Sequence, residues 1–465
     1  MLRDQGKLEE AKKLYEKSLE IRVNCLGEDH TDVAQSYCSI GNVLKGQGKF
    51  DAAKLLMEKA ASHLISSYGT EDHLDLGWIY NNLGSVLKDQ GDLAGAKKHY
   101  EKALKIRINC LGTKNHRDIA TTYVNLGDVL KGQKFFAEAK AAYETALEIR
   151  IACLGRNHID VADCYDNIGL ALLLQSDFSG AKTIYENALE IYTDCLGTNH
   201  ASVAATYSNI GTALKAQGHL VEAKKSYENA LEFYIIYRKE SDVKAAKIYK
   251  NLGDVLKAQE DYSGAKEAYK NALEVYIACR GENHEDVADS YVNIGGLLKA
   301  QGDFVGAKTA YETALKMYVE CLGKNHETVA NTYYKFGNML KAQEDYSGAK
   351  EAYENALEVY IACRGENHED VADSYKKIGD VLQAQGNLEE AKTAYENELK
   401  VRIVCVGTDN IKVAESYVRV ADVCLLLKQL ERARDCYTEA KQIYQQSDGD
   451  TYNAYFDDKI SECLA

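Results

Sequence analysis

The chain alternates between two apolar patterns, and each has the spacing of one face of an α-helix. In residues 286–302, DVADSYVNIGGLLKAQG, the i, i+4, i+7 and i+11 positions are apolar, namely Val287, Tyr291, Ile294 and Leu298. In residues 263–279, SGAKEAYKNALEVYIAC, a similar stripe comprises Ala265, Ala268, Tyr269, Ala272, Leu273 and Tyr276. The two patterns predict a pair of consecutive helices that form a helical hairpin.

This hairpin pattern repeats along the chain every 42 or 43 residues. A glycine marks each repeat, with Lys239 at the one exceptional place: Gly27, Gly69, Gly112, Gly155, Gly197, Gly281, Gly323, Gly365 and Gly407. The segment RGENHEDVADSY even occurs twice, at residues 280–291 and 364–375, as a duplication of two repeats would produce. Such a period is typical of solenoids, in which each repeat buries its apolar face against its neighbours. The sequence therefore predicts an all-α fold.

The repeat resembles the tetratricopeptide repeat. Its spacing is reproduced by Tyr291, Ile294, Gly295, Leu298, Ala307, Tyr311 and Ala314, and by Tyr123, Leu126, Gly127, Leu130, Ala139, Tyr143 and Ala146. The usual unit has about 34 residues, and the extra residues here fall in a longer second helix and a loop such as 154–158. This longer form is similar to the repeats of kinesin light chain and of nephrocystin-3-like proteins. The resemblance implies a right-handed α-α superhelix of about ten helical hairpins.

Two features differ from kinesin light chain. The heptad coiled coil that binds the motor is absent, and the proline that usually follows the loop histidine is replaced, as at Thr31, Ile159, Glu285 and Glu369. The repeat pattern predicts one solenoid domain over residues 1–465, with residues 1–24 as a partial first repeat and 450–465 as a C-terminal capping helix. We expect further sequence before Met1, or a partner, to cover the start of the stack.

Local signals predict how the helices begin, end and pack. Ser263 is the expected cap of a second helix, and Gly281 is expected to end that helix in the left-handed conformation. Asn283, followed by Asp286, is the expected cap of the next first helix. Small residues such as Gly295 and Ala307 are expected to let the two helices of a hairpin approach closely.

Composition narrows the class of protein. The chain has no proline in 465 residues, which excludes proline-rich linkers and argues against an all-β fold. A net charge of −15 argues against general binding to nucleic acid or to anionic membranes. Because the start is charged and no run of 18 apolar residues occurs, we expect neither a signal peptide nor a membrane span, and a cytoplasmic location.

Cysteine and histidine also follow the repeat. Eight of the thirteen cysteines lie two residues before a repeated glycine, so we expect reduced and mostly buried thiols, with a redox role as the alternative. Eight histidines lie in the loops between repeats: His30, His73, His116, His158, His200, His284, His326 and His368. Each would come from a different repeat, without a zinc-ligand spacing, so the sequence favours a structural role in the loop over a metal site.

No catalytic motif is present. The chain has no Walker sequence, nucleophile elbow or dinucleotide fingerprint, and its carboxylates are spread evenly over the predicted solvent faces. We therefore expect neither an enzyme nor a bound cofactor.

The candidate site is the concave groove that the first helices line in this family. In the family, the residue before the Leu or Ile of the first-helix motif points into this groove. In successive repeats of this chain, that position is occupied by Ser39, Asn82, Asn125, Asn167, Asn209, Asn251 and Asn293. An amide offers a donor and an acceptor together, so a row of amides can pair with the backbone of an extended peptide. The alternative is that each asparagine bonds only to the neighbouring helix.

Charge and apolar side chains add detail to this groove. The row continues as Lys335, Lys377 and Arg419, with Lys376 beside it, which predicts a preference for acidic or carboxylate-ended segments. One repeat carries Leu170, Leu173 and Leu174 at positions that are polar elsewhere, which predicts an apolar contact patch, with tighter local packing as the alternative. Trp78 occupies another groove position, or else fills the core.

These observations predict an adaptor that binds extended segments of partner proteins, like the cargo-binding domain of a kinesin light chain. The resemblance adds a kinesin heavy chain as a partner, which would be held through sequence before Met1. The alternative is the ligand-sensing or regulatory array of a larger signalling protein.

Overall fold

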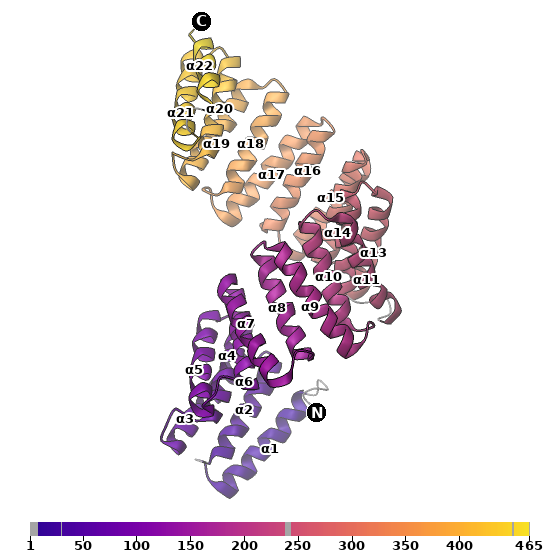
Figure 1. Cartoon of the computed structure of the whole chain (residues 1–465). Helices are drawn as coiled ribbons and strands as arrows, with labels where there is room; N and C mark the ends of the chain where they lie inside the picture. Colours follow the sequence, from indigo (N-terminus) through magenta and orange to yellow (C-terminus); the bar gives the residue numbers. More distant parts are fainter. Residues whose placement is uncertain (1–7, 29, 238–242, 449–450, 465) are drawn as a thin grey trace. The chain divides into compact units, whose positions relative to one another are not determined.

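The computed structural model describes residues 8–28, 30–237, 243–448 and 451–464, and all regular structure in these ranges is α-helical (Figure 1). The predicted all-α class is therefore confirmed. By internal contacts the chain divides into two compact units, Met1–Tyr237 and Arg238–Ala465. A single domain over residues 1–465 stays a prediction.

Unit 1 contains a lone helix followed by five helical hairpins. The lone helix α1, Leu8–Leu26, lies in the segment that the sequence predicts as a partial first repeat. The hairpins are α2 (Thr31–Gly46) with α3 (Phe50–Tyr68), α4 (Leu74–Gln90) with α5 (Leu93–Leu111), α6 (Arg117–Gly132) with α7 (Phe136–Leu154), α8 (Ile159–Leu174) with α9 (Phe178–Leu196), and α10 (Ala201–Ala216) with α11 (Leu220–Tyr237).

Unit 2 contains five more hairpins and a final short helix. The hairpins are α12 (Val243–Ala258) with α13 (Tyr262–Arg280), α14 (Glu285–Ala300) with α15 (Phe304–Leu322), α16 (Glu327–Ala342) with α17 (Tyr346–Arg364), α18 (Glu369–Ala384) with α19 (Leu388–Val406), and α20 (Ile411–Leu426) with α21 (Leu430–Asp448). The last helix, α22 (Asn453–Glu462), packs on α21 and buries Phe456.

Within each unit, every helix packs against the next helix in the sequence, as expected for a tetratricopeptide solenoid. The first helix of a hairpin, such as α14, has 16 residues, and the second, such as α15, has 19. The extra length of this repeat therefore lies partly in the second helix, as the sequence predicts.

The two helices of a hairpin meet where a glycine faces a buried tyrosine. A Cβ atom on Gly127 would lie 2.5 Å from Cε1 of Tyr143, which is too close for any side chain. Gly295 meets the Tyr311 ring in the same way at 3.1 Å, and the Ala307 beside it is fully buried. The prediction that small residues allow close packing is confirmed.

The helix caps differ from the predicted ones. The cap of α13 is Asp261 and not Ser263, because the Asp261 carboxylate accepts a 2.9 Å hydrogen bond from the backbone N–H of Gly264. The cap of α14 is His284 and not Asn283. Gly281 ends α13 as predicted, but its φ of +86° and ψ of 167° are not those of the predicted left-handed helical conformation.

The repeated cysteines were expected to be mostly buried, and this is wrong. Six are exposed and two are partly exposed, because their place in the last turn of the second helix faces away from the core: Cys25, Cys110, Cys153, Cys195, Cys279, Cys321, Cys363 and Cys405. The buried cysteines are the five outside the repeated position: Cys38, Cys164, Cys424, Cys436 and Cys463. All thirteen are free thiols.

Candidate functional site

The first helices of each unit present three positions that recur in every repeat. We call the predicted amide position the asparagine row, as at Asn125. The acid position directly follows the repeated first-helix glycine, as at Asp128, and the lysine position lies three residues later, as at Lys131. Together these positions make up the first-helix face.

Acid and lysine positions are linked from one repeat to the next. In unit 1, Lys88 Nζ donates to Asp128 Oδ2 of the following repeat at 3.3 Å, and Lys131 Nζ donates to Oδ1 at 3.2 Å. The Tyr143 hydroxyl donates to the same carboxylate at 2.8 Å. Burial alone would raise the pKa of Asp128, but the tyrosine and the two lysines outweigh it and lower the pKa. The carboxylate is therefore held ionised between three donors.

The six asparagines of the row are half-buried in the structure: Asn82, Asn125, Asn167, Asn209, Asn251 and Asn293. Asn125 Nδ2 donates to Asn81 Oδ1 of the preceding repeat at 3.1 Å, and Asn209 Nδ2 donates to Asp166 Oδ1 at 3.1 Å. The alternative interpretation, bonding to the neighbouring helix, is therefore confirmed at these two positions. Asn82 Nδ2 is buried and has no hydrogen-bond partner among the residues that the structure describes.

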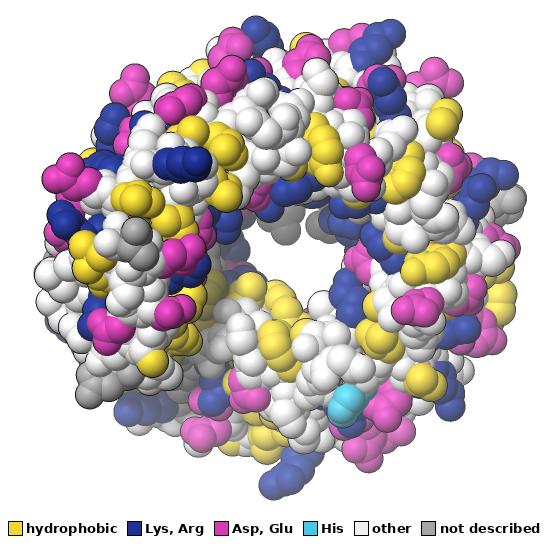
Figure 2. Space-filling view, turned by 90° about the horizontal axis from the view of Figure 1, so that it is seen from above, with side chains coloured by type: hydrophobic (Ala, Val, Ile, Leu, Met, Phe, Trp, Pro, Cys, Tyr) yellow, Lys and Arg dark blue, Asp and Glu magenta, His cyan; other side chains and the backbone are white. Residues whose placement is uncertain are grey.

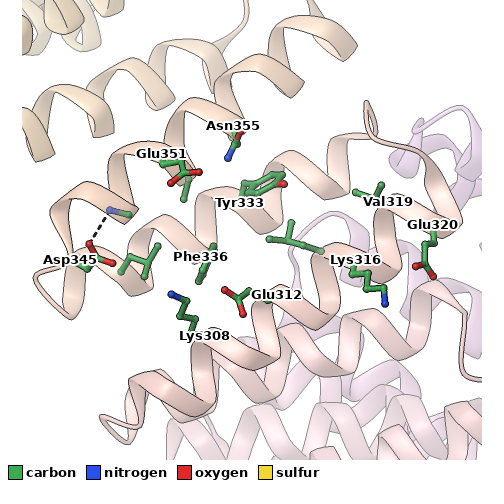
Figure 3. Close-up of a pocket in the computed structure, with 14 residues that line it drawn as sticks. Lys308, Glu312, Lys316, Val319, Glu320, Tyr333, Phe336, Asp345, Glu351 and Asn355 are labelled. Carbon is green, nitrogen blue, oxygen red and sulfur yellow. Dashed lines mark hydrogen bonds between the residues drawn. The ribbon is translucent and has the colours of Figure 1, made fainter.

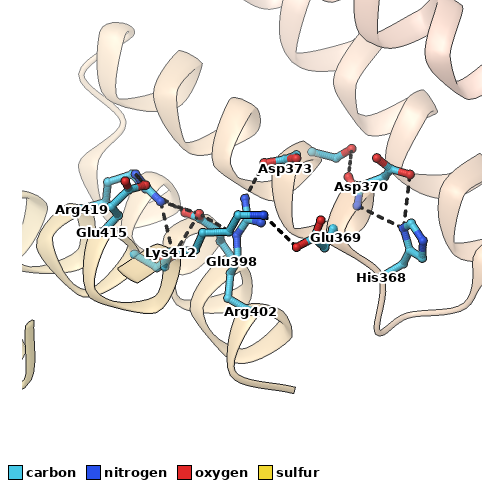
Figure 4. A network of polar contacts seen from close by, with 11 residues as sticks. His368, Glu369, Asp370, Asp373, Glu398, Arg402, Lys412, Glu415 and Arg419 are labelled. Carbon is cyan, nitrogen blue, oxygen red and sulfur yellow. Dashed lines mark hydrogen bonds and ion pairs between the residues drawn. The ribbon is translucent and has the colours of Figure 1, made fainter. Parts of the chain in front are cut away.

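The basic residues that follow the row have different surroundings. Lys335 is exposed, and Lys376 and Lys377 are half-buried. Arg419 is not a free groove cation, because its Nε and Nη2 donate to both oxygens of Glu398 at 3.0 and 2.7 Å (Figure 4). The sequence pattern could not show this pairing, which joins α19 to α20.

The acceptor of these bonds, Glu398, is fully buried and occupies a position that is alanine in other repeats, such as Ala356. Ser416 Oγ also donates to Glu398 at 3.0 Å, and Arg402 Nε lies 3.6 Å from it (Figure 4). Arg402 in turn pairs with Asp373 on α18. Burying a carboxylate lowers the stability of the fold unless a positive charge is paired with it. The role of Arg419 is therefore to neutralise the charge of Glu398.

The predicted apolar patch lies on α8. Leu170 and Leu173 are half-buried, and Leu174 is 40% exposed. Leu170 takes the acid position, and in the described part of the chain the buried hydroxyl of Tyr185 beside it has no hydrogen-bond partner. Trp78 is 41% exposed and lines a cavity of about 250 Å³ with Ser39, so the core-filling interpretation of this residue is wrong.

A larger cavity, of about 570 Å³, lies in unit 2 away from the asparagine row (Figure 3). Second helices α15 and α17 form its sides with charged residues such as Lys308, Glu312 and Glu351, and Tyr333 and Phe336 of α16 form its floor. No sequence pattern pointed to this cavity, because its floor residues occupy ordinary core positions of the repeat.

Two other kinds of site are absent from the described ranges. Within residues 8–28, 30–237, 243–448 and 451–464, no cluster of histidine, cysteine or carboxylate side chains could hold a metal ion. In the same ranges, no helix is both long and apolar enough to cross a membrane. Figure 2 shows basic, acidic and hydrophobic side chains interspersed over the face in view.

Family models identify the repeat. A tetratricopeptide repeat model matches residues 1–66, 118–194, 177–235, 244–320, 291–362, 328–403 and 370–446, and a second one matches residues 76–118. The chain belongs to the tetratricopeptide repeat family. Repeats of this family generally mediate protein–protein binding, which supports an interaction scaffold. A search of curated proteins found no match.

Three solved structures are similar to this chain at low sequence identity. A signal transduction ATPase from Pyrococcus horikoshii, described as having a tetratricopeptide repeat sensor, is 15% identical with a TM-score of 0.52, over 83% of this chain and 55% of that one. A putative kinesin light chain from Podosopora anserina is 17% identical with a TM-score of 0.41, over 45% of this chain and 99% of that one. BtubC from P. vanneervenii is 20% identical with a TM-score of 0.43, over 50% and 92%.

Proposed function

We propose that this tetratricopeptide protein is an interaction scaffold that binds extended segments of partner proteins along its first-helix face. The observation that carries the proposal is the row of half-buried amides at one repeated position. Asn125 donates one N–H to Asn81, and its amide oxygen accepts no hydrogen bond from the described residues. The Asn125 amide therefore keeps groups that can pair with a peptide backbone.

The charge on this face favours acidic segments. Lys335, Lys376 and Lys377 add positive charge to the first helices of unit 2, in a chain whose net charge is −15. A basic patch attracts acidic partner segments, which speeds their association and favours them over other segments. The rest of the protein surface is acidic and repels the same segments. Arg419 would contribute by holding Glu398 and not by contact with the ligand.

The finer role that we propose is a cargo adaptor in the cytoplasm, because the length of the repeat and its histidine loop are similar to those of kinesin light chain. A kinesin heavy chain is the corresponding partner, and nucleic acid and membranes are not proposed as ligands. The second candidate is a ligand sensor within a larger signalling protein, since the Pyrococcus protein that shares the fold is described as carrying such a sensor.

The test is peptide selection on the purified protein, followed by titration of the selected peptides. Asn125→Ala and Asn167→Ala should each make the free energy of binding less favourable by about 0.5–1.5 kcal/mol, the usual net value of a neutral hydrogen bond. The loss should be the same for every peptide, whatever its sequence. Lys377→Glu should instead weaken acidic peptides and reduce the salt dependence of their binding.

Asn187→Ala is the matched control, because Asn187 is an exposed amide on the second helix α9 and should not affect binding. Equal affinity of the wild type and of all variants would place the partner surface elsewhere and reject the proposed function.

A further inference from the structure

One repeat lacks a side chain at the acid position. Of the ten repeats, one has Leu170 at this position, and another has Gly296, in α14. The other eight repeats carry a polar residue there: Asn42, Ser85, Asp128, Thr212, Asp254, Asn338, Asp380 and Asp422. In unit 2 the polar residue accepts from a second-helix tyrosine hydroxyl, as Asp254 does from Tyr269 at 2.7 Å. The corresponding hydroxyl, that of Tyr311, has no such partner among the described residues.

Packing does not require this glycine. A Cβ atom on Gly296 would lie 3.4 Å from Lys257 Nζ and 3.5 Å from the Tyr311 hydroxyl, which are ordinary contact distances to the ends of side chains. By contrast, a Cβ on the adjacent Gly295 would lie only 3.1 Å from the Tyr311 ring. Glycine inside a helix costs about 1 kcal/mol relative to alanine, so Gly296 keeps a space open at some cost in stability.

The space is a cavity of about 260 Å³ that is lined mainly by hydrogen-bond donors. Lys257, Lys335, the Tyr311 hydroxyl and the Asn293 amide converge on it from α12, α16, α15 and α14. Asp254 also lines the cavity, but its carboxylate accepts the hydroxyl of Tyr269.

Positive charge around the cavity is balanced only in part, by Asp254. In another repeat of unit 2, the residue at the lysine position pairs with the acid position of the next repeat: Lys341 Nζ lies 3.5 Å from Asp380 Oδ2. A Cβ atom on Gly296 would lie 3.4 Å from Lys257 Nζ, so this lysine meets no acid there. Neither Lys257 nor Lys299 has an ion pair with any residue that the structure describes, although Asp254 is near enough to act on the pKa of Lys257.

The pKa shifts agree with this geometry. Burial lowers the pKa of Lys257; Asp254 opposes this effect and the charge of Lys335 adds to it. Burial also lowers the pKa of Lys299, and the charges of Lys257 and Lys377 lower it further. Lysines from four successive first helices are thus close enough to repel one another, and a bound anion would relieve that repulsion.

The charge of the cavity favours a phosphoryl group over a carboxylate. A phosphomonoester carries about −1.5 to −2 charge and three acceptor oxygens, whereas a carboxylate carries a single charge. Two lysines line the cavity, and lysine binds phosphate as a point charge.

We propose that the Gly296 cavity binds the phosphoryl group of a phosphorylated serine or threonine in a partner segment. This inference rests on the proposed function, because Asn293 belongs both to the asparagine row and to the cavity wall, so a segment along the row would pass the cavity. Partner recognition by unit 2 would then be switched on by phosphorylation.

The test uses Gly296→Asp, which restores the acid of other repeats beside Lys257 and Tyr311. Fluorescein-labelled glycine–serine peptides with a central phosphoserine, glutamate or serine are titrated by fluorescence polarisation. The wild type should prefer the phosphoserine peptide over the glutamate peptide by about tenfold or more, as expected for added charge-assisted hydrogen bonds. Gly296→Asp should abolish this preference, and Lys257→Gln should reduce it.

Thr212→Asp is the matched control, because it introduces the same charge at the same repeat position of unit 1, where Thr212 Oγ1 and the Tyr227 hydroxyl are 3.1 Å apart. It should leave the phosphoserine preference unchanged. Thermal unfolding should show that Gly296→Asp is at least as stable as the wild type, so that lost binding cannot be attributed to unfolding.

Equal phosphoserine affinity in the wild type and Gly296→Asp would overturn the proposal, and so would equal affinity for the phosphoserine and glutamate peptides. Inorganic phosphate is the third probe. If Gly296→Asp weakened the binding of inorganic phosphate but not the binding of the phosphoserine peptide, the cavity would be a site for free anions, and the proposal would also be overturned. The proposed function is judged separately, from selected unphosphorylated peptides and the Asn125 and Asn167 variants.

Discussion

At the scale of the residue, a histidine begins almost every first helix. In eight loops the histidine Nδ1 accepts the backbone N–H two residues later, as His158 does from Asp160 at 3.0 Å. Asn410 makes the equivalent bond to Lys412 at 2.9 Å. The ring thus satisfies one of the N–H groups that a helix leaves unpaired at its start. The structural role predicted for the loop histidines is confirmed.

This role predicts the effect of two substitutions at one loop. His158→Ala should lower the free energy of unfolding by about 0.5–2 kcal/mol, the usual value of a lost N-cap. His158→Asn should retain most of the stability, because Asn410 already caps α20 in the same way. Urea unfolding of the three proteins measures the difference. Equal losses in both variants would mean that the ring contributes by packing and not by capping.

At the scale of the element, charge joins α19 to α20 where other repeats use apolar contact. Glu398 replaces the usual alanine, and Arg419 replaces the asparagine of the following first helix. The two changes lie in different repeats and compensate each other through two hydrogen bonds. Because an ion inside a protein needs its partner, neither residue is expected to tolerate replacement alone.

Arg419→Asn should therefore cost about 3–5 kcal/mol, because it removes the main partner of the buried Glu398. The double variant Glu398→Ala with Arg419→Asn restores the alanine and asparagine of the other repeats and should recover most of the loss. A double-mutant cycle by denaturant unfolding measures this coupling. Additive losses, without recovery in the double variant, would contradict the proposed compensation.

At the scale of the whole molecule, stability is a sum over neighbouring repeats. Within each unit, each helix packs mainly against the helices before and after it in the sequence. In such a stack the interfaces are nearly independent, so damage at one hairpin spreads first to its neighbours. Local opening is therefore expected to differ from repeat to repeat.

Ala307→Leu tests this expectation within unit 2. Ala307 is fully buried between α14 and α15, so a larger side chain should overpack the hairpin and cost about 1–3 kcal/mol. Hydrogen exchange should show lost protection in α14 and α15 first, then in α13 and α16, while α20 and α21 keep theirs. Simultaneous loss throughout unit 2 would indicate a single cooperative transition instead.

The repeat pattern alone determined the helical class, the hairpins and the close contact of glycine with tyrosine, because these features arise within one repeat and recur. It also pointed to the asparagine row and to the basic residues after it. Whether these residues bind peptides stays a prediction, since the structure shows where they lie and not what they hold.

Only the tertiary structure decided which side chains meet between repeats. It paired Arg419 with Glu398, exposed Trp78 and the repeated cysteines, and brought Lys257 and Lys335 to the cavity beside Gly296. The sequence did contain a signal for the cavity beside Gly296, because Gly296 is the one residue at the acid position that has no side chain. This signal could not be interpreted there, because the distance between a lysine and the acid position of the next repeat depends on how the helices stack.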